Sequence, residues 1–221
     1  MKRTAFLLAS ACLFSACNNN PKEELSHQQD NTSNTEITGS IPTTQPETPD
    51  RFDIQSIPLT TADIGAFPFI NLPEGLKERS KPLIKKFDQC FFPIDGVMTP
   101  FDGKLYKVDV VSEQGEEFSK HYFERSMENY LTSVGAVKVY DGKITREEYY
   151  RYTKIGSNSS SQGHIGYFDE PIKFYVIRSK DKGNIYIQFS SENLSAKLNI
   201  LQEESFQQTI TKVTSTEIAK D

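Results

Sequence analysis

The chain has 221 residues, a length that accommodates one medium-sized domain together with additional segments. Its net charge is −5, and the lysines and arginines are scattered among the aspartates and glutamates. Because the sequence contains no basic stripe, a nucleic-acid partner is not expected. Beyond residue 17, no apolar run approaches the roughly 18–20 residues that a membrane-spanning helix needs.

The first seventeen residues have the pattern of an export signal. Two basic residues follow the initiator methionine, and the apolar stretch 5–14 has the length of a signal core but is too short to span a membrane. Ordinary cleavage before Cys17 would place the bulky Phe14 where a small side chain is needed. Ordinary cleavage before Cys12 would leave a very short apolar core, so neither ordinary cut fits well.

The residues FSAC at 14–17 resemble the lipobox of bacterial lipoproteins, whose usual form is Leu, a small residue, Gly or Ala, then Cys. Phe at the first position departs from the commonest form. In that family the cysteine thiol receives a diacylglyceryl group and the signal is cut just before it. The resemblance therefore implies a removed signal peptide at 1–16 and a lipidated Cys17. A plain cleaved signal and an uncleaved segment remain the alternatives.

The resemblance also implies an address in the envelope of a Gram-negative bacterium. In enteric bacteria, Asp directly after the cysteine typically retains a lipoprotein in the inner membrane, and this chain has Asn18 there. We therefore expect an outer-membrane protein on the periplasmic face, with the cell surface as the alternative. Two or three acyl chains hold a protein stably at a membrane without any spanning helix.

Residues 17–50 are expected to form the lipidated cysteine and a disordered tether. The segment 18–51 contains no aromatic residue and is dominated by polar side chains and proline. Such a composition cannot bury enough apolar surface to offset the entropy of ordering it. A flexible tether of this length would have a root-mean-square span of about 30 Å.

Residues 51–212 are expected to form a single α+β domain, followed by a frayed tail at 213–221. In chain order, the sequence predicts strands at 87–95 and 103–113, a long helix at about 116–134, a strand at 136–140, a short helix at about 146–155, and strands beginning near 172, 184 and 196. Because helices do not alternate regularly with strands, we expect a mostly antiparallel sheet with both helices packed on it.

Local patterns support these elements. In the strand 103–113, polar residues alternate with apolar ones, which suggests one buried face. The long helix carries apolar residues at spacings of three and four, with acidic residues at its start and Gly135 at its end. In the short helix, Thr145 and Glu148 are placed for a capping box, in which each side chain accepts from the other residue's backbone N–H.

Several segments of the body together resemble the N-terminal module of some Gram-negative envelope lipoproteins, in which an OmpA-like peptidoglycan-binding domain follows. These segments are DIGAFPFINLPEGL, DGKLYKV, RSMENYLTSVGAVKVYDGKI, FYVIRSKDKGNIYIQF and LNILQEESFQQ. The resemblance spans roughly residues 60–210 and rests on scattered apolar and glycine positions. Because the sequence stops at Asp221, we expect no direct peptidoglycan-binding domain here.

No catalytic or metal-binding motif stands out, so we expect no cofactor and no metal. Cys90 lies among aromatic residues and is expected to be a buried structural thiol. His121 is expected on an exposed helix face, and His164 in a mobile polar loop at 157–164. Tyr149 and Tyr152 share a helix face and should pack on the sheet, while Tyr150 points elsewhere and is the candidate partner contact.

These observations favour a non-catalytic lipoprotein whose domain binds another envelope protein or serves envelope assembly. Such a protein should present an apolar or aromatic surface patch. One alternative is a lipid-anchored inhibitor or immunity-type protein that blocks an enzyme. A further alternative is an envelope hydrolase, which would need a deep pocket that brings His121 or His164 against a serine or a carboxylate.

Overall fold

The computed structural model describes residues 52–156 and 162–212. The predicted signal peptide, the lipidation site Cys17, most of the 157–164 loop and the tail at 213–221 lie outside these residues. In chain order the elements are η1 (Ile54–Ser56), β1 (Leu59–Thr60), β2 (Leu76–Glu78), β3 (Leu83–Ile94), β4 (Val97–Ser112), α1 (Lys120–Ser133), β5 (Val137–Gly142), α2 (Arg146–Lys154), β6 (Ile172–Ser179), β7 (Gly183–Ser191) and β8 (Ala196–Glu203).

The strands form one curled sheet with the order β1-β6-β7-β8-β4-β2. Strand β5 also pairs with β6, and β3 also pairs with β4. Apart from the two-residue parallel pairing of β1 with β6, all these pairings are antiparallel. The prediction of an α+β fold with a mostly antiparallel sheet and two helices is confirmed.

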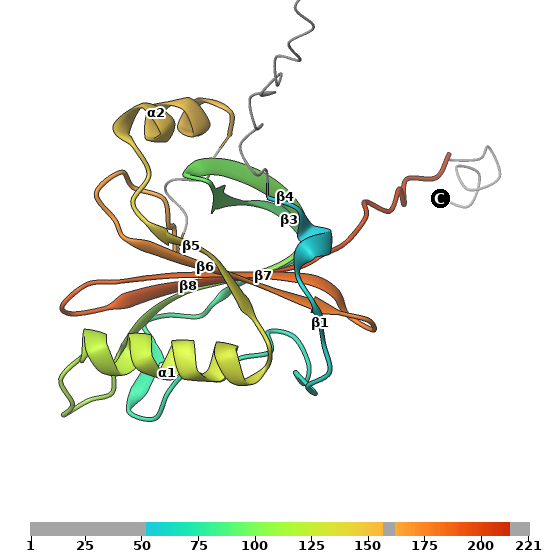
Figure 1. Ribbon diagram of the computed structural model, residues 1–221. Coiled ribbons are helices and arrows are strands. Elements are labelled where there is room, and N and C mark those ends of the chain that lie inside the picture. Colours follow the sequence, from blue (N-terminus) through green and yellow to red (C-terminus); the bar gives the residue numbers. More distant parts are fainter. Residues whose placement is uncertain (1–51, 157–161, 213–221) are drawn as a thin grey trace, which may run out of the picture. The chain divides into compact units, whose positions relative to one another are not determined.

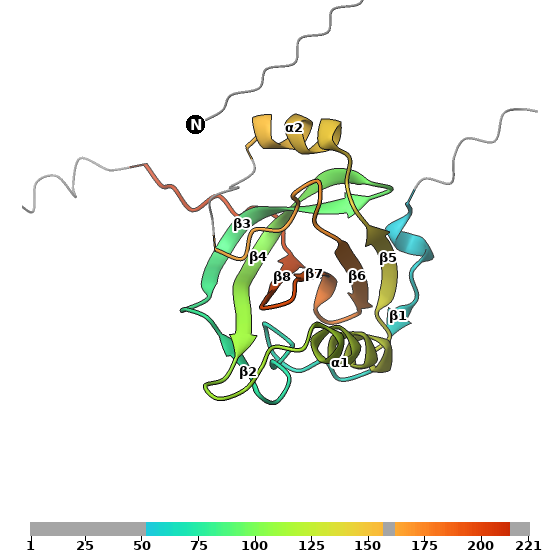
Figure 2. The same cartoon turned by 90° about the vertical axis from the view of Figure 1, so that its left-hand side faces the viewer.

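The described residues form three layers (Figure 1). Helix α1 covers one face of the sheet, and the hairpin of β3 and β4 arches over the opposite face. Strand β4 can serve both layers because it is long: Gly103–Val110 pair with β8, while Val97–Asp102 continue into the hairpin. Figure 2 shows the arch reaching across the sheet toward β5, with α2 above it.

The face toward α1 is mostly apolar, and its polar exceptions Lys173 and Ser191 both donate hydrogen bonds to Glu124 of α1. Helix α1 contributes Phe123, Met127 and Leu131, which are at most 1% exposed. They pack against alternate residues of the central strands, including Val108, Ile187, Phe189, Leu198 and Ile200. Because successive side chains of a strand point to opposite faces of the sheet, every second residue of these strands faces the core under α1.

The face toward the arch is apolar at one end and polar at the other. At the apolar end, Phe92 of the arch is fully buried, with its ring centroid 5.1 Å from Phe174 and 5.7 Å from Tyr186. Toward the other end, the same face carries Lys107, which is only 6% exposed. The prediction that this strand has a single buried face is therefore wrong, because the arch and residues 162–170 cover the second face.

The boundaries of α1 differ from the prediction at its beginning. The helix begins at Lys120 rather than at 116, because the side chain of Ser119 accepts a hydrogen bond from the backbone N–H of Tyr122 and caps it. Gly135 follows the helix with φ of 77°, as expected of a left-handed C-terminal residue. Neither described helix is long and apolar enough to cross a lipid bilayer.

Helix α2 is capped by Thr145, whose side chain accepts from the N–H of Glu148, as predicted. The reciprocal half of the capping box is absent in this helix. The carboxylate of Glu148 instead accepts from the backbone N–H of Met98 (2.6 Å) and pairs with Arg151. These contacts tie α2 to the hairpin of β3 and β4, so α2 packs on the part of the curled sheet that forms the arch.

Candidate functional site

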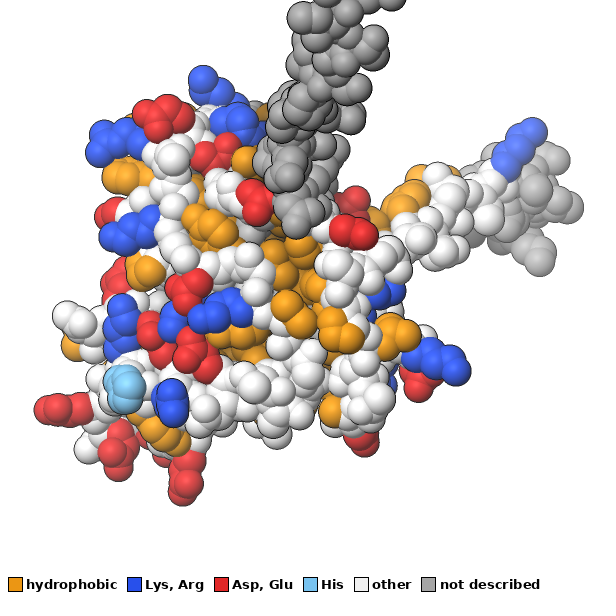
Figure 3. All heavy atoms as spheres, in the orientation of Figure 1, with side chains coloured by type: hydrophobic (Ala, Val, Ile, Leu, Met, Phe, Trp, Pro, Cys, Tyr) orange, Lys and Arg blue, Asp and Glu red, His pale blue; other side chains and the backbone are white. Residues whose placement is uncertain are grey.

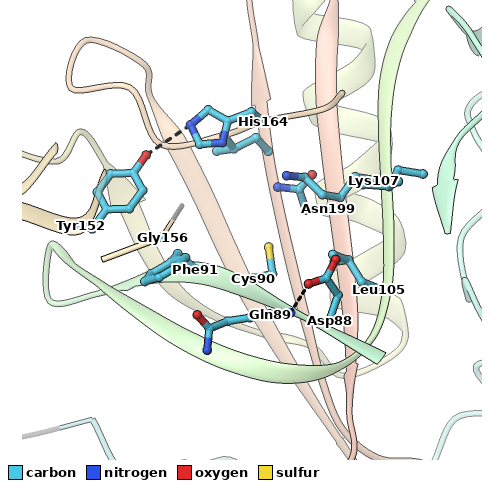
Figure 4. A pocket seen from close by; sticks show the side chains of 12 residues that line it. Asp88, Gln89, Cys90, Phe91, Leu105, Lys107, Tyr152, Gly156, His164 and Asn199 are labelled. Carbon is cyan, nitrogen blue, oxygen red and sulfur yellow. Dashed lines mark hydrogen bonds between the residues drawn. The ribbon is translucent and has the colours of Figure 1, made fainter. Parts of the chain in front are cut away.

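A row of buried polar side chains lies beneath the arch. Lys107 of β4 stands opposite Asn199 of β8, which in turn stands opposite Gln188 of β7. Asn199 and Gln188 are each 1% exposed. Burying polar groups costs free energy unless they find partners. Figure 4 shows the space between Lys107 of β4, Asn199 of β8, Cys90 of the arch and His164.

The neighbouring polar residues of this face hold a covering segment, residues 162–170. Asp109 accepts from the backbone N–H of Gly163 (3.2 Å), and Lys197 pairs with Glu170 (2.8 Å). Glu170 also accepts from the N–H of Gly166 (3.0 Å). Because this segment has no strand partner of its own, these side chains satisfy backbone groups that would otherwise be buried unpaired.

Asn199 also holds the covering segment in place. With its side-chain nitrogen turned toward the covering segment, Asn199 donates to the carbonyl oxygen of Gly163 (2.7 Å), and its oxygen accepts from Nε2 of Gln188 (3.1 Å). Gln188 Nε2 also donates to the carbonyl oxygen of Phe91 (3.0 Å). The amide pair therefore links the covering segment, the sheet and the arch.

His164 is buried in this cluster, with 7% of its surface exposed, which corrects the prediction of a mobile, solvated loop position. Its Nε2 lies 3.3 Å from the hydroxyl of Tyr152, which donates to the carbonyl oxygen of Gly166 (2.8 Å). Burial, together with the positive charges of the nearby Lys107 and Lys197, lowers the pKa of His164 from 6.5 to about 4. The imidazole is consequently neutral at physiological pH.

Cys90 lies on the arch at the edge of this space and is 5% exposed, as the sequence predicts. Burial raises the pKa of its thiol to about 11, although Lys107 acts in the opposite direction. The enclosed cavity between Cys90, Lys107, His164 and Asn199 has a volume of about 30 Å³, which is room for one or two water molecules.

The chemistry of this cluster follows from these protonation states. A protonated thiol is a poor nucleophile, and a neutral, buried imidazole does not stabilise a thiolate. The contacts described above instead join three layers of the fold. Two buried atoms of this face, Gln188 Oε1 and Ser190 Oγ, have no hydrogen-bond partner among the described residues. We therefore interpret the cluster as structural. We call the contacts of Asp109, Glu170, Lys197 and Asn199 with the covering segment the internal clasp.

A larger hollow lies at the surface beside α1. It has a volume of about 400 Å³, within the range of binding sites for small molecules and short peptide segments. Tyr122, Ser126 and Tyr130 line it from one helix face at a spacing of four residues, and residues 69–73 line the other side. The buried Phe69 and Met127 also line it. We call this hollow the α1 groove.

Tyr130 and Tyr122 differ in how they are held in the α1 groove. The hydroxyl of Tyr130 donates to the carbonyl oxygen of Phe69 (2.6 Å), which fixes the helix to the segment 69–73. Tyr122 is 43% exposed and is available for contact. In the α1 groove, Tyr130 is therefore held in place by its hydrogen bond, while the exposed ring of Tyr122 can become buried when a partner binds.

Tyr150, the predicted partner contact, is 52% exposed on α2. Its ring lies 5.5 Å from that of Tyr149, which also meets the rings of Tyr167 (5.8 Å) and Phe168 (5.8 Å). Tyr152, expected on the sheet, is fully buried against Phe91 of the arch. Tyr150 therefore lies at the edge of an aromatic cluster centred on Tyr149, and its role as a partner contact stays a prediction.

The other residues singled out in the sequence are placed as follows. His121 is exposed on α1, as predicted, and Cys17 lies outside the described residues. Within residues 52–156 and 162–212, no group of three histidine, cysteine or carboxylate side chains could hold a metal ion. Sequence reasoning missed the α1 groove, although the spacing of Tyr122, Ser126 and Tyr130 was visible in the sequence.

Comparisons of this chain with models of protein families, with curated proteins and with solved structures found no match in any of the three.

Proposed function

We propose that this chain is an outer-membrane lipoprotein, anchored through a diacylglyceryl group on Cys17, whose folded domain binds another envelope protein without catalysing a reaction. The α1 groove is the observation that carries the binding role. It combines a suitable volume, apolar side chains and two tyrosines, which are among the residue types enriched at the energetic centres of protein interfaces.

The sequence supports the proposed anchor. FSAC at 14–17 follows a short apolar core, and the polar residues after Cys17 suit a chain that leaves the bilayer at once. A tether between the anchor and the domain lets the groove search the space around the anchor. The tether thereby raises the effective concentration of any partner in the same membrane.

The test is photo-cross-linking in intact cells with a photoreactive amino acid at Ser126, between Tyr122 and Tyr130 in the groove. We expect a cross-linked product that contains one envelope protein, identified by mass spectrometry. Tyr122→Ala should reduce the yield of this product by about tenfold or more, since a buried interface tyrosine can contribute about 2 kcal/mol. The exposed Tyr122 can be truncated with little effect on the core.

The matched control places the same photoreactive amino acid at His121, which is exposed on the same helix but does not line the groove. The proposal requires that this position yield much less of the same product. Equal yields from positions 121 and 126, or a yield at 126 that Tyr122→Ala leaves unchanged, would show that the α1 groove is not the binding site.

A further inference from the structure

Helix α2 carries a stripe of exposed cationic and aromatic side chains. Arg146, Tyr150 and Lys154 recur every four residues and so lie on one side of the helix. All three are exposed. With a rise of 1.5 Å per residue, the backbone positions of the two basic residues are about 12 Å apart along the helix axis, with that of the tyrosine between them. We call these three residues the α2 stripe.

The segment that carries the stripe has a charge opposite in sign to that of the whole chain. Residues 143–154 contain four cationic and two acidic side chains, whereas the whole chain has a net charge of −5. Of the two acids, Glu148 points inward, where it accepts from the N–H of Met98 and pairs with Arg151. Glu147 is the exposed acid of this segment. Figure 3 shows both basic and acidic side chains in the α2 region.

Aromatic side chains pack against residues of the α2 stripe. Arg146 lies over the ring of Phe168, 4.4 Å from its centroid, and Tyr149 packs between Tyr150 and Tyr167. Tyrosine has an apolar ring and a polar hydroxyl, and for this reason it is enriched where proteins meet the headgroup region of a bilayer. The stripe thus combines cations with side chains suited to that region.

We propose that the α2 stripe docks on an anionic phospholipid surface, with Arg146 and Lys154 at headgroup phosphates and the Tyr150 ring between them. Helix α2 stands out as a ridge in both ribbon views, and a ridge suits a flat lipid surface better than it suits a partner side chain that needs a pocket (Figures 1 and 2). Charge complementarity supplies the attraction.

The inference rests on the proposed membrane address and adds an orientation to it. Helices α1 and α2 lie on opposite sides of the sheet (Figure 1). When the α2 stripe rests on the membrane, the α1 groove faces away from the lipid, toward partners. The stripe then acts as a weak second attachment that orients a domain already held by its anchor.

The test uses the chain from residue 17 onward with Cys17→Ala, which keeps every described residue and has no lipid of its own. Binding is measured by co-sedimentation with vesicles of phosphatidylcholine alone and with about one-third phosphatidylglycerol. We expect binding to the anionic vesicles only, and weaker binding at higher salt. Arg146→Glu with Lys154→Glu should lower the affinity at least about 20-fold, on the basis of about fivefold per basic residue.

The matched control, Lys81→Glu with Lys85→Glu, makes the same change in net charge at exposed positions in and before β3. The control should bind like the starting protein. Equal losses in both double variants would show that overall charge drives binding, and absence of binding by the starting protein would also overturn the docking proposal. Neither result would bear on cross-linking in the α1 groove, so the two proposals can fail separately.

Discussion

The environment of His164 in the fold differs from the one that its flanking residues in the sequence predict. It follows a run of serines and glycine, which is typical of a solvated loop. In the fold, its imidazole is covered by the clasp and shares its surroundings with Lys107 and Lys197. Burial and two nearby cations all disfavour the protonated form, so the clasp is built around a neutral ring.

This arrangement predicts a pH-dependent stability. The pKa of His164 is about 4 in the folded protein and about 6.5 when unfolded, so protonation favours the unfolded chain. The stability that depends on the neutral ring is fully present above pH 6.5 and is lost as pH falls toward 4, by at most about 3 kcal/mol. We expect His164→Gln to lose less unfolding free energy than wild type over this range in urea titrations.

The exposed His121 provides the control for this prediction. His121→Gln removes an exposed histidine on α1 and leaves the contacts of His164 intact. Carboxylates also titrate at the acid end of the range, so the informative quantity is the difference between wild type and variant. Identical profiles for wild type and His164→Gln would contradict the burial of a neutral His164.

At the scale of elements, the β3–β4 hairpin organises the second core. Strand β4 turns from the sheet into the arch around Gly103, which pairs with both Asp88 and Glu203. A Cβ atom at Gly103 would overlap the main-chain carbonyl oxygen of Gln202. Because that oxygen belongs to the backbone of β8, it cannot move without disturbing the central strands, and only glycine fits this position.

Gly103→Ala should therefore destabilise the fold by about 3 kcal/mol or more, since β8 must shift to make room. The matched control is Gly142→Ala in β5. A Cβ atom there would lie 3.3 Å from the hydroxyl of Tyr140, a side chain that can move, and we expect a cost below about 1 kcal/mol. Chemical denaturation measures both. Similar costs for the two variants would show that β4 does not approach β8 so closely at Gly103.

At the scale of the molecule, the described domain presents different surfaces on its two sides. The α1 groove lies on one side of the sheet and the α2 stripe on the other (Figure 1). The internal clasp of Asp109, Glu170, Lys197 and Asn199 holds the layers on the α2 side together. An anchored domain with two such surfaces can face the membrane and a partner at once.

The state of the cysteines tests the proposed maturation of the whole chain. The sequence has three, at 12, 17 and 90. Removal of residues 1–16 and lipidation of Cys17 leave Cys90 as the one free thiol. Because burial raises its pKa to about 11, we expect no rapid reaction with a thiol reagent in the native protein and one reactive thiol per chain in denaturant.

Protein purified from membranes is the material for this count. Three reactive thiols in denaturant would show that the signal is retained and Cys17 is unmodified, which would contradict the lipid anchor. A fast reaction of the native protein would instead show that Cys90 is accessible, which would contradict its place under the arch. Mass spectrometry of the N-terminal peptide identifies the modification on Cys17.

Local patterns in the sequence were sufficient for the elements whose signals lie within a few residues. The local spacings predicted both helices and the strands β3 to β8 but missed the short strands β1 and β2, and the cap at Thr145 is confirmed. The burial of Cys90 and the exposure of Tyr150 and His121 also followed from their immediate neighbours.

The sequence by itself thus determined the fold class, the order of elements and the expectation of a lipidated N-terminus. Only the tertiary structure decided that both faces of β4 are covered, that His164 is buried, and that residues 69–73 meet α1 to form a groove. The physical reason is the range of the contacts. Lys107 and His164 are buried by segments that are distant from them in the sequence. Local periodicity does not predict such long-range contacts.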